Sequence, residues 1–454
     1  MPTAARSRVS DATARRWLRR VEGVAGRHDM PGIGVAVVHR GRPVWSAGVG
    51  SADVGRRRAA RPDSIFRLAS ITKLFTATAV LMLAEEGRLS VDDPVRRHVP
   101  AFPGQAITVR HLLAHGGGLQ RETPDDPGWR TGEFLSGDDL LAVLKRAKRP
   151  FSPLERWKYS NLGYTTLGEL VTNLSGAPYV RFVTERIIEP LGMRSTAFDP
   201  SRLPAARITS GYRRSPAGEI ELEPASNDRV PDAAGQLFST APDLARIVGL
   251  LCGDLGDDSP LQPATIEAMR RPQIMADASW KQGHGLGPML FRFGDRVLVG
   301  HAGGLWGHAG WLLSWPERHV GAVALTNVGD GELLFSMVAA LAQEAGAVVR
   351  REGLEPRPEP DRTRPPDQVR GLLGRFNGDG FVLRVRWRNG ALEANTPRRP
   401  GIAAPKPMPL RLLTPDELLF EAGPYVGETA VLDRDATGRV TGWEVCTYRF
   451  DRVE

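Results

Sequence analysis

The sequence predicts an α/β domain whose sheet is assembled from distant segments, followed by a small all-β domain. Strand-like alternation of apolar and polar residues occupies residues 33–53 and returns at 297–327. Between these segments, from about residue 108 to 250, the pattern is mostly helical. Residues 368–454 alternate again between turn signals. A chain of 454 residues, 41% of them hydrophobic, is long enough to bury a core in both parts.

The first domain, which we place at residues 1–350, begins with a helix and a hairpin. An amphipathic helix is expected at about 10–28, and residues 33–53 should form a hairpin around Gly41. At 66–89 the pattern changes to apolar residues at helical spacing that end at a glycine. This segment is apolar nearly all round, so we expect a central, buried helix.

The second domain follows a linker. The strand-like run that ends the first domain has a turn at Pro316 to His319. Residues 351–367 are charged and proline-rich, which is typical of a linker. Beyond them, 381–394 alternates around an Asn-Gly turn and predicts a half-buried antiparallel hairpin. The segment 368–454 should therefore be a small open sheet or barrel.

Charge and cysteine content exclude several classes of protein. The formal charge is +8 and the isoelectric point about 9.8, but arginine is spread widely and the longest basic run is Arg56–Arg58. The basic patch that nucleic-acid binding needs is therefore missing. Two cysteines, Cys252 and Cys446, allow neither a disulfide framework nor a four-cysteine zinc site, and we expect packing roles for both.

The N-terminal sequence leads to an expectation about location. MPTAARSRVSDATARRWLRR is polar and arginine-rich, without the apolar core of a secretory signal. No run approaches the ~18 apolar residues of a membrane span. We therefore expect a soluble, cytoplasmic protein with neither a membrane nor a nucleic acid as its partner.

The first chemical motif is Ser70-Ile71-Thr72-Lys73, at the start of the predicted buried helix. Helical spacing places the hydroxyl of Ser70 and the amine of Lys73 on one face, and the helix N-terminus favours negative charge nearby. Such a pattern arises by chance about once in a chain of this size. The alternative to a catalytic pair is that Ser70 caps the helix and Lys73 is solvated. Arginine outnumbers lysine by a wide margin here, however, and only lysine can lose its proton when desolvated and act as a base.

Two further motifs carry groups that can assist a nucleophile. In an extended backbone, Tyr159 and Asn161 point to one side, where a phenol can relay a proton and an amide can bind a carbonyl. Their alternative roles are a core contact and a helix cap. His301 precedes two glycines, whose N–H groups are open to a substrate carbonyl. His308 competes with His301, and a histidine without any catalytic part is the alternative for both.

Together, these motifs resemble a known family. The signature of class C serine β-lactamases, penicillin-binding peptidases and their esterase relatives is matched in order by Ser70-x-x-Lys73, Tyr159-x-Asn161 and His301-x-Gly303. The flanking stretches TVRHLLAHGGGL, PLGMRSTAF, GQLFSTAPDLARIVGLL and GHGLGPML resemble the family too, over about residues 20–345. The C-terminal segment is similar to the lipocalin-like β-domain that several members carry.

The resemblance implies a fold and a catalytic mechanism. The fold is a β-lactamase/transpeptidase-like antiparallel sheet flanked by helices, with a helical lobe beside it and the active site in the groove between them. Ser70 would be the nucleophile and Lys73 its base. Tyr159 would carry the proton to and from the leaving group. The backbone N–H groups of Ser70 and Gly304 would form the oxyanion hole.

The resemblance also implies the residues that bind the substrate, and it contains two departures. Asn161 would orient Lys73 and the substrate amide, while His301 and Gly303 would flank the acyl group. Where penicillin-binding members usually have Lys-Thr-Gly, this chain has His301-Ala302-Gly303, so the cation and hydroxyl that hold a β-lactam carboxylate are absent. Efficient β-lactamase activity is therefore not expected. The usual Pro-Gly-Glu is replaced by Pro153-Leu154-Glu155, away from the chemistry.

Three functions follow as expectations. Family members with a histidine in the third motif include esterases, D-amino-acid-directed peptidases and penicillin-binding-protein-type thioesterases that macrocyclise nonribosomal peptides. We expect a serine hydrolase or acyltransferase that forms an acyl-enzyme on Ser70 from an ester, thioester or amide, including D-residue peptides. The cyclising thioesterase, with a carrier-protein-bound substrate, is the specific alternative. A ligand-sensing module that is acylated once and never turned over is the other.

No cofactor and no metal are predicted. The sequence has no phosphate-binding glycine loop after a predicted strand and no His-Glu-x-x-His pattern. His111 and His115 are spaced as a helical pair, but they lack the glutamate of a zinc protease, so we expect them to pack beside the groove. The acyl group, its acceptor and the oligomeric state have no motif in this sequence.

Overall fold

The computed structural model contains two compact units, Met1–Glu355 and Pro356–Glu454, and each is described by itself. Most of the predicted linker, and Cys446, lie outside the described residues. The structure describes residues 3–4, 8–102, 106–122, 142–215, 218–223, 232–329, 331–352, 354, 364–378, 381–388, 390–395, 407–421, 426–445 and 448–453.

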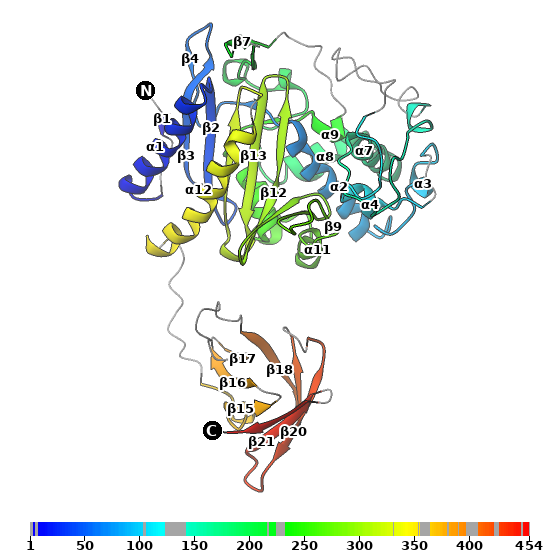
Figure 1. The fold of residues 1–454 in the computed structure, drawn as a ribbon, viewed down its shortest axis with the longest axis vertical. Helices are drawn as coiled ribbons and strands as arrows, with labels where there is room; N and C mark the ends of the chain where they lie inside the picture. The colour runs from blue at the N-terminus through cyan, green and yellow to red at the C-terminus, as the bar shows by residue number, and fades with distance from the viewer. Residues whose placement is uncertain are drawn as a thin grey trace. The chain divides into compact units, whose positions relative to one another are not determined.

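A ten-stranded antiparallel sheet forms the centre of the first unit (Figure 1). Its order is β1-β3-β2-β14-β13-β12-β11-β10-β9, with β4 paired to β3. Neighbouring strands β2 and β14 therefore come from the two ends of the domain sequence, which confirms the prediction of a sheet built from distant segments. The bounds are β1 (Thr3–Ala4), β2 (Gly32–His39), β3 (Arg42–Asp53), β4 (Arg58–Ala59), β9 (Ile274–Met275), β10 (Gln282–His284), β11 (Met289–Phe293), β12 (Arg296–Leu305), β13 (His308–Trp315) and β14 (Val320–Thr326).

Helices cover both faces of this sheet because its central strands are apolar on both sides. All eight residues of β2 are buried. Val35 and Val37 join the core of α1 and α12, whereas Ala36 and Val38 join the core that contains α2 and α10. The helices of the first unit are α1 (Asp11–Arg27), α2 (Lys73–Glu85), α3 (Val95–His98), α4 (Val109–Leu113), α7 (Asn161–Ser175), α8 (Tyr179–Val183), α9 (Asp232–Gly235), α10 (Ala245–Cys252), α11 (Pro263–Met269) and α12 (Glu332–Arg351).

Short helical turns and two small strand pairs complete the first unit. Strand β5 (Phe66–Arg67) pairs with β8 (Phe238–Ser239), and β6 (Tyr212–Arg214) pairs with β7 (Ile220–Leu222). The turns are η1 (Ala69–Thr72), η2 (Thr184–Ile188), η3 (Pro200–Arg202), η4 (Ala205–Arg207), η5 (Gly256–Asp258) and η6 (Pro316–Arg318).

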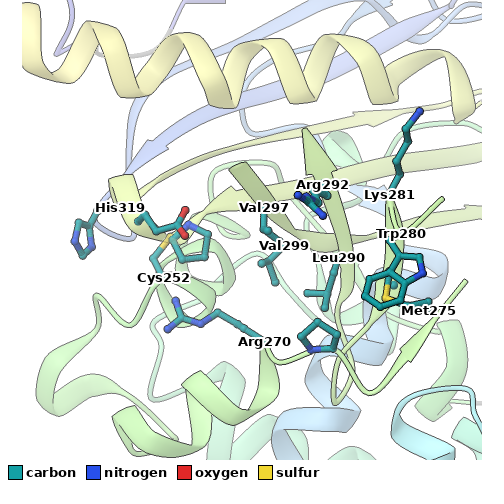
Figure 2. A pocket seen from close by; sticks show the side chains of 14 residues that line it. Cys252, Arg270, Met275, Trp280, Lys281, Leu290, Arg292, Val297, Val299 and His319 are labelled. Atoms are coloured by element: carbon teal, nitrogen blue, oxygen red, sulfur yellow. The ribbon is translucent and has the colours of Figure 1, made fainter. Parts of the chain in front are cut away.

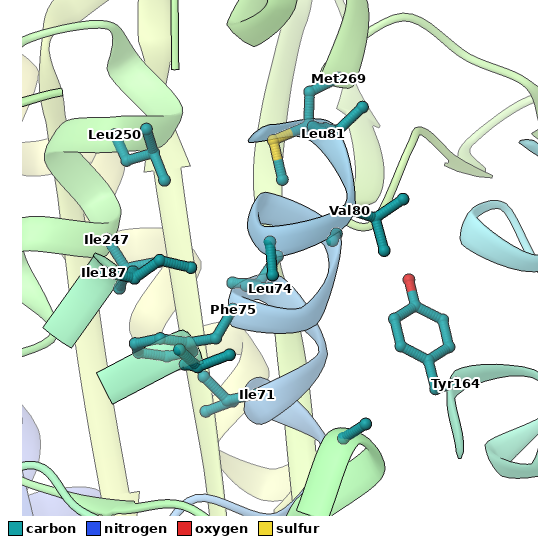
Figure 3. Close-up of a cluster of buried hydrophobic side chains, with 14 of the residues drawn as sticks. Ile71, Leu74, Phe75, Val80, Leu81, Tyr164, Ile187, Ile247, Leu250 and Met269 are labelled. Atoms are coloured by element: carbon teal, nitrogen blue, oxygen red, sulfur yellow. The ribbon is translucent and has the colours of Figure 1, made fainter. Parts of the chain in front are cut away.

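The buried helix predicted within 66–89 is α2. Eleven of its residues, Lys73–Leu83, are buried, and Gly87 follows its end in a left-handed conformation. Figure 3 shows Leu74, Phe75 and neighbouring side chains of this helix among apolar side chains from other segments. The helix therefore forms the centre of the helical lobe, as the all-round apolar pattern predicted.

Two predicted turns are also confirmed. Between β2 and β3, Arg40 and Gly41 have φ of 48° and 65°, which matches a tight hairpin turn. Between β13 and β14, η6 is followed by His319 in a left-handed conformation. Both turns have the positive φ that closes antiparallel strands.

Helix α12 is the one helix among the described residues that is long and apolar enough to cross a membrane. Within the domain, 56% of its most apolar window is buried. Its buried side chains, including Leu334, Val338 and Leu341, belong to the same apolar core as strands β2 and β14. The hydropathy of α12 is therefore that of a core helix covering a sheet.

The second unit is a closed eight-stranded barrel, the architecture predicted for a lipocalin-like domain. Leu383 and Val385 are buried while Arg384 and Arg386 are exposed, as the alternation predicted. Its aromatic core includes Phe376 and Trp443, with ring centres 4.0 Å apart. Helix α13 (Asp367–Arg370) precedes β15 (Gly374–Gly378), β16 (Phe381–Arg388), β17 (Ala391–Asn395), β18 (Met408–Thr414), β19 (Glu417–Phe420), β20 (Thr429–Arg434), β21 (Val440–Val445) and β22 (Tyr448–Arg452).

Candidate active site

Ser70 lies in the tight turn η1, immediately before α2. The sequence predicted it on the first turn of the helix, whereas the structure has a 3₁₀ turn there and α2 begins at Lys73. Ala69 has a φ of 47°, a left-handed conformation that residues other than glycine rarely adopt. Strand β12 packs so closely against this turn that only a glycine fits at position 303. A Cβ atom added to Gly303 would lie 2.0 Å from the carbonyl oxygen of Leu68. The strand and the turn together fix the backbone of Ser70.

Lys73 is fully buried, and its amine contacts three oxygens. Nζ donates to Ser70 Oγ at 3.1 Å, to Asn161 Oδ1 at 2.7 Å and to the carbonyl oxygen of Ala234 at 2.7 Å. Burial holds the pKa of Lys73 well below its usual value, and the carboxylate of Glu122 opposes this effect. Once neutral, the amine can still donate to Asn161 and Ala234, so its lone pair faces Ser70.

Asn161 is oriented by groups on both sides of its amide. It begins α7, where Ser160 caps the helix by accepting the Gly163 N–H at 3.0 Å. The Asn161 Nδ2 donates to the carboxylate of Glu122, which leaves Oδ1 facing Lys73. The predicted role of Asn161 in orienting Lys73 is therefore supported by the geometry.

Tyr159 lies over Lys73, with Nζ 5.0 Å from the centre of its ring. Burial raises the pKa of the phenol, and a hydrogen bond with Ser70 partly offsets that rise. The guanidinium of Arg121 lies 5.0 Å from the same ring, and the ring of His115 lies 4.3 Å away. The phenol is therefore protonated at neutral pH and within reach of Ser70.

The edge of strand β12 opens beside Ser70. Strand β11 pairs with β12 only as far as Gly300, so His301 to Leu305 have no partner from β11 and pair with β13 alone. No described atom lies within 4 Å of a Cβ atom placed on Gly304. A substrate can therefore approach the backbone of Gly304 closely.

A cavity of about 820 Å³ has Ser70, Tyr159 and Gly304 in its wall. Aromatic rings form one wall, where Phe335 lies 4.7 Å from Trp311 and 4.9 Å from Phe291, measured between ring centres. The cavity thus has a reactive polar end and an apolar end. It is lined by Ser70, Arg121, Trp157, Lys158, Tyr159, Gln282, Met289, Phe291, His301, Ala302, Gly303, Gly304, Trp311, Gly329, Gly331, Glu332 and Phe335.

Three buried histidines, His115, His284 and His301, meet beside Tyr159, with their potential ligand atoms within 4.8 Å of one another. Burial lowers the pKa of each ring, that of His284 to about 4, so all three are neutral at pH 7. His115 Nδ1 accepts the N–H of Ser160 at 3.1 Å, so its proton is on Nε2 and no lone pair is free there. His115 in this tautomer therefore offers no lone pair to a metal ion among the three rings.

Known proteins resemble this chain in sequence as well as in fold. A family model described as Beta-lactamase matches residues 17–347, well over half of the chain. The chain belongs to this family. The β-lactamase family in this sense is a family of serine hydrolases that also includes penicillin-binding proteins.

Relatives of this β-lactamase-family chain match it over different lengths. Protein flp of Staphylococcus aureus (strain MW2) is 26% identical over 308 residues, which are 66% of this chain and 60% of that protein. The solved structure of SurE is 25% identical with a TM-score of 0.61, covering 97% of this chain and 99% of SurE. A D-stereospecific amidohydrolase from Streptomyces sp. is 26% identical with a TM-score of 0.61, covering 72% of this chain and 98% of that one.

The structure also separates the two candidate histidines of this β-lactamase-family domain. His301 lines the cavity with Ser70. His308 is buried elsewhere: Nε2 is 3.0 Å from Thr209 Oγ1, and Nδ1 is 3.2 Å from the carbonyl oxygen of Trp306. Both ring nitrogens of His308 are occupied in the fold, so it is not placed to act on a substrate in the cavity.

Several groups at the site carried no signal in the sequence. Arg121 and Glu122 follow a glycine-rich loop, and Trp311 and Phe335 belong to none of the three motifs. Residues 123–141 and 224–231 lie outside the described residues. His115 does lie beside the groove, as the sequence led us to expect.

Proposed function

We propose that the protein is a serine hydrolase or acyltransferase that forms an acyl-enzyme on Ser70 from an ester, thioester or amide. Family membership makes it a serine hydrolase in the broad sense, and the proposal adds the reaction and the roles of the residues. The observation that carries it is the amine of Lys73, which is fully buried and 3.1 Å from Ser70 Oγ. A desolvated lysine next to a serine hydroxyl is an effective general base.

Acylation follows from the positions of four groups. Neutral Lys73 takes the proton of Ser70 as Oγ attacks the carbonyl carbon of the substrate. The N–H groups of Ser70 and Gly304 would bind the negative charge that develops on the carbonyl oxygen. Tyr159 donates its proton to the departing alcohol, thiol or amine and regains one from the Lys73 ammonium. The products of this step are a free leaving group and an ester on Ser70.

Deacylation uses the same groups in reverse. Water or an amine attacks the ester on Ser70 and gives its proton to Tyr159, which passes its own proton to neutral Lys73. The Lys73 ammonium then returns a proton to Ser70 Oγ as the bond to the acyl group breaks. Water yields hydrolysis, whereas an amine of the same peptide yields a ring.

For the acyl donor, we propose a peptide or amino-acid derivative with a D-residue at the reacting carbonyl. The likeness to a D-stereospecific amidohydrolase supports this choice. The aromatic wall of Phe291, Trp311 and Phe335 suits a large apolar side chain on that residue. The absence of a Lys-Thr-Gly motif at His301 argues against β-lactams as good substrates.

Macrocyclisation of a peptidyl thioester is the second candidate. It is favoured by the volume of the cavity, about 820 Å³, which is more than a single residue needs. A folded-back peptide could place its own amine near the ester on Ser70. A carrier-bound thioester would be met in the cytoplasm, where we propose that the protein acts.

The test compares the protein with its Ser70→Ala variant on p-nitrophenyl esters and on peptidyl thioesters that end in a D- or an L-residue. Intact-protein mass spectrometry would detect the acyl adduct, and small-molecule mass spectrometry would separate linear from cyclic product. We expect an adduct and turnover that depend on Ser70, with the D-series preferred.

Each other outcome has a defined meaning. Cyclic product would favour the cyclase, and linear product alone would favour the hydrolase. A stoichiometric burst without turnover would favour the ligand-sensing module. If the Ser70→Ala variant were as active as the unmodified protein, the assignment of the nucleophile would be wrong.

A further inference from the structure

A second cavity, the rear cavity, is bordered by residues of β10, β11 and β12 (Figure 2). Its volume is about 560 Å³, and none of Ser70, Lys73 and Tyr159 lines it. Figure 2 shows Leu290, Val297 and Val299 near its middle, between Cys252 at one end and Trp280 at the other. The centre of the rear cavity is therefore apolar.

The cavity that Ser70 lines, here called the Ser70 cavity, shares strands with the rear cavity. Met289 and Phe291 of β11 line the Ser70 cavity, whereas Leu290 and Arg292 line the rear cavity. Side chains alternate between the two faces of a strand, so the two cavities lie on opposite faces of the same sheet edge. A ligand in the rear cavity would thus contact the back of the strand that walls the Ser70 cavity.

Positive charge gathers at the rim of the rear cavity. Lys281, directly before β10, and Arg292 on β11 are exposed neighbours, since the N–H of Arg292 donates to the carbonyl oxygen of Lys281 at 2.8 Å. Neither has an ion-pair partner among the described residues, and like charges on paired strands destabilise a sheet. The one acid that lines the cavity, Glu317, accepts a hydrogen bond from the Trp315 indole. An anion between the two cations would relieve their repulsion.

Trp280 is held at the rear cavity by a rigid turn. Its φ of 58° is left-handed, and 67% of its surface is exposed. The carboxylate of Asp277 accepts the N–H groups of Lys281 at 3.1 Å and Gln282 at 2.8 Å, which fixes the turn. A strained backbone that exposes a large indole beside an apolar cavity is characteristic of a ligand site.

We propose that the rear cavity binds an amphipathic carboxylate. Its apolar chain would lie on Leu290, Val297 and Val299, and its carboxylate would bind Lys281 and Arg292. The apolar floor disfavours a small polar anion, because such an ion would leave that surface uncovered. The two cations disfavour a neutral lipid, because they would lose water without gaining a partner.

The experiment measures decanoate binding by isothermal titration calorimetry, below its micelle concentration, with the full chain carrying Ser70→Ala. This background prevents any reaction at Ser70, so the result does not depend on the proposed function. We expect saturable binding of one decanoate. The Lys281→Gln/Arg292→Gln double variant should weaken it about tenfold or more, because it removes two charged hydrogen-bond donors. The analogue 1-decanol should also bind more weakly.

The control removes the same charge elsewhere, with Arg88→Gln/Lys145→Gln, two exposed residues that do not line the rear cavity. It should bind decanoate as tightly as the parent. Val297→Phe, which fills the cavity, should abolish binding, and thermal unfolding checks that each variant is folded. Equal binding by all variants, equal affinity for 1-decanol, or no binding would each overturn the proposal.

Discussion

At the start of helix α2 two opposite sides are equally buried, but burial has opposite consequences on each. On one side, Lys73 is surrounded by oxygens from Ser70, Asn161 and Ala234. On the other, Phe75, two residues further along, is surrounded by apolar side chains (Figure 3). Apolar burial stabilises the fold, whereas burial of an amine costs stability and lowers its pKa. The comparison teaches that the helix gives up stability on one side for a base and recovers it on the other.

Substitution of Lys73 should have the largest effect on activity. We expect Lys73→Met to lower kcat/KM by about 10³-fold or more, because the base is lost. The free energy of unfolding should stay the same or rise, since an apolar side chain replaces a buried amine. Lys73→Arg is the matched control, because it keeps a long basic side chain but stays protonated and cannot supply a neutral base. A Lys73→Arg enzyme with nearly full activity would contradict the role of Lys73.

Substitution on the apolar side of the helix should have the reverse effect. Phe75 is fully buried in the core of the helical lobe. Phe75→Ala should lower the free energy of unfolding by about 3–5 kcal/mol. The folded fraction should keep kcat/KM within about tenfold, since Phe75 touches none of the reacting groups. Chemical denaturation measures the free energy of unfolding, and steady-state kinetics at low temperature measure kcat/KM. A fall in kcat/KM well beyond tenfold in protein that is still folded would break the comparison.

Two adjacent glycines of β12 offer a smaller but sharper test. Gly303→Ala would bring a Cβ atom within 2.0 Å of the Leu68 carbonyl oxygen and displace the turn that carries Ser70. We expect kcat/KM to fall about 10²-fold, the typical cost of a misplaced nucleophile. Gly304→Ala meets no described atom within 4 Å and keeps its N–H, so its loss should be smaller. Equal losses in steady-state kinetics would argue against the packing of β12 on the turn.

The smallest expected effect is a shift in pH dependence. The reaction needs neutral Lys73, so kcat/KM should rise with pH through the pKa of Lys73 and then level off. The carboxylate of Glu122 raises that pKa, so Glu122→Gln should lower it further. The rising limb of the pH profile should therefore move to lower pH. A shift to higher pH would mean that Glu122 acts on Lys73 in some other way.

The sequence predicted the parts of the molecule that depend on local pattern. The helix within 66–89, the hairpin at Gly41 and the alternation around Leu383 and Val385 all depend on periodicity within one segment. The conjunction of three short motifs identified the family. In each case the physical cause lies among neighbouring residues, which a sequence displays directly.

The rest depends on tertiary contacts that no spacing reveals. The carbonyl oxygen of Ala234 completes the surroundings of Lys73, yet a backbone group carries no sequence signal. Ala69 has a left-handed backbone conformation, which a sequence usually marks with a glycine, but here the residue is alanine. The aromatic wall joins Phe291, Trp311 and Phe335 from separate elements, so only the folded chain shows it.

The central claim is that burial lowers the pKa of Lys73 and so makes its neutral amine available as a base, and one measurement tests it directly. The chain has only six lysines, so carbon-13 labelling of their ε-carbons gives few NMR signals, and Lys73→Arg assigns one of them. We predict that the Lys73 signal titrates well below the usual lysine pKa of about 10.4. If the Lys73 signal titrated near that usual value, Lys73 would be an ordinary ammonium and the account of Ser70 activation would be wrong.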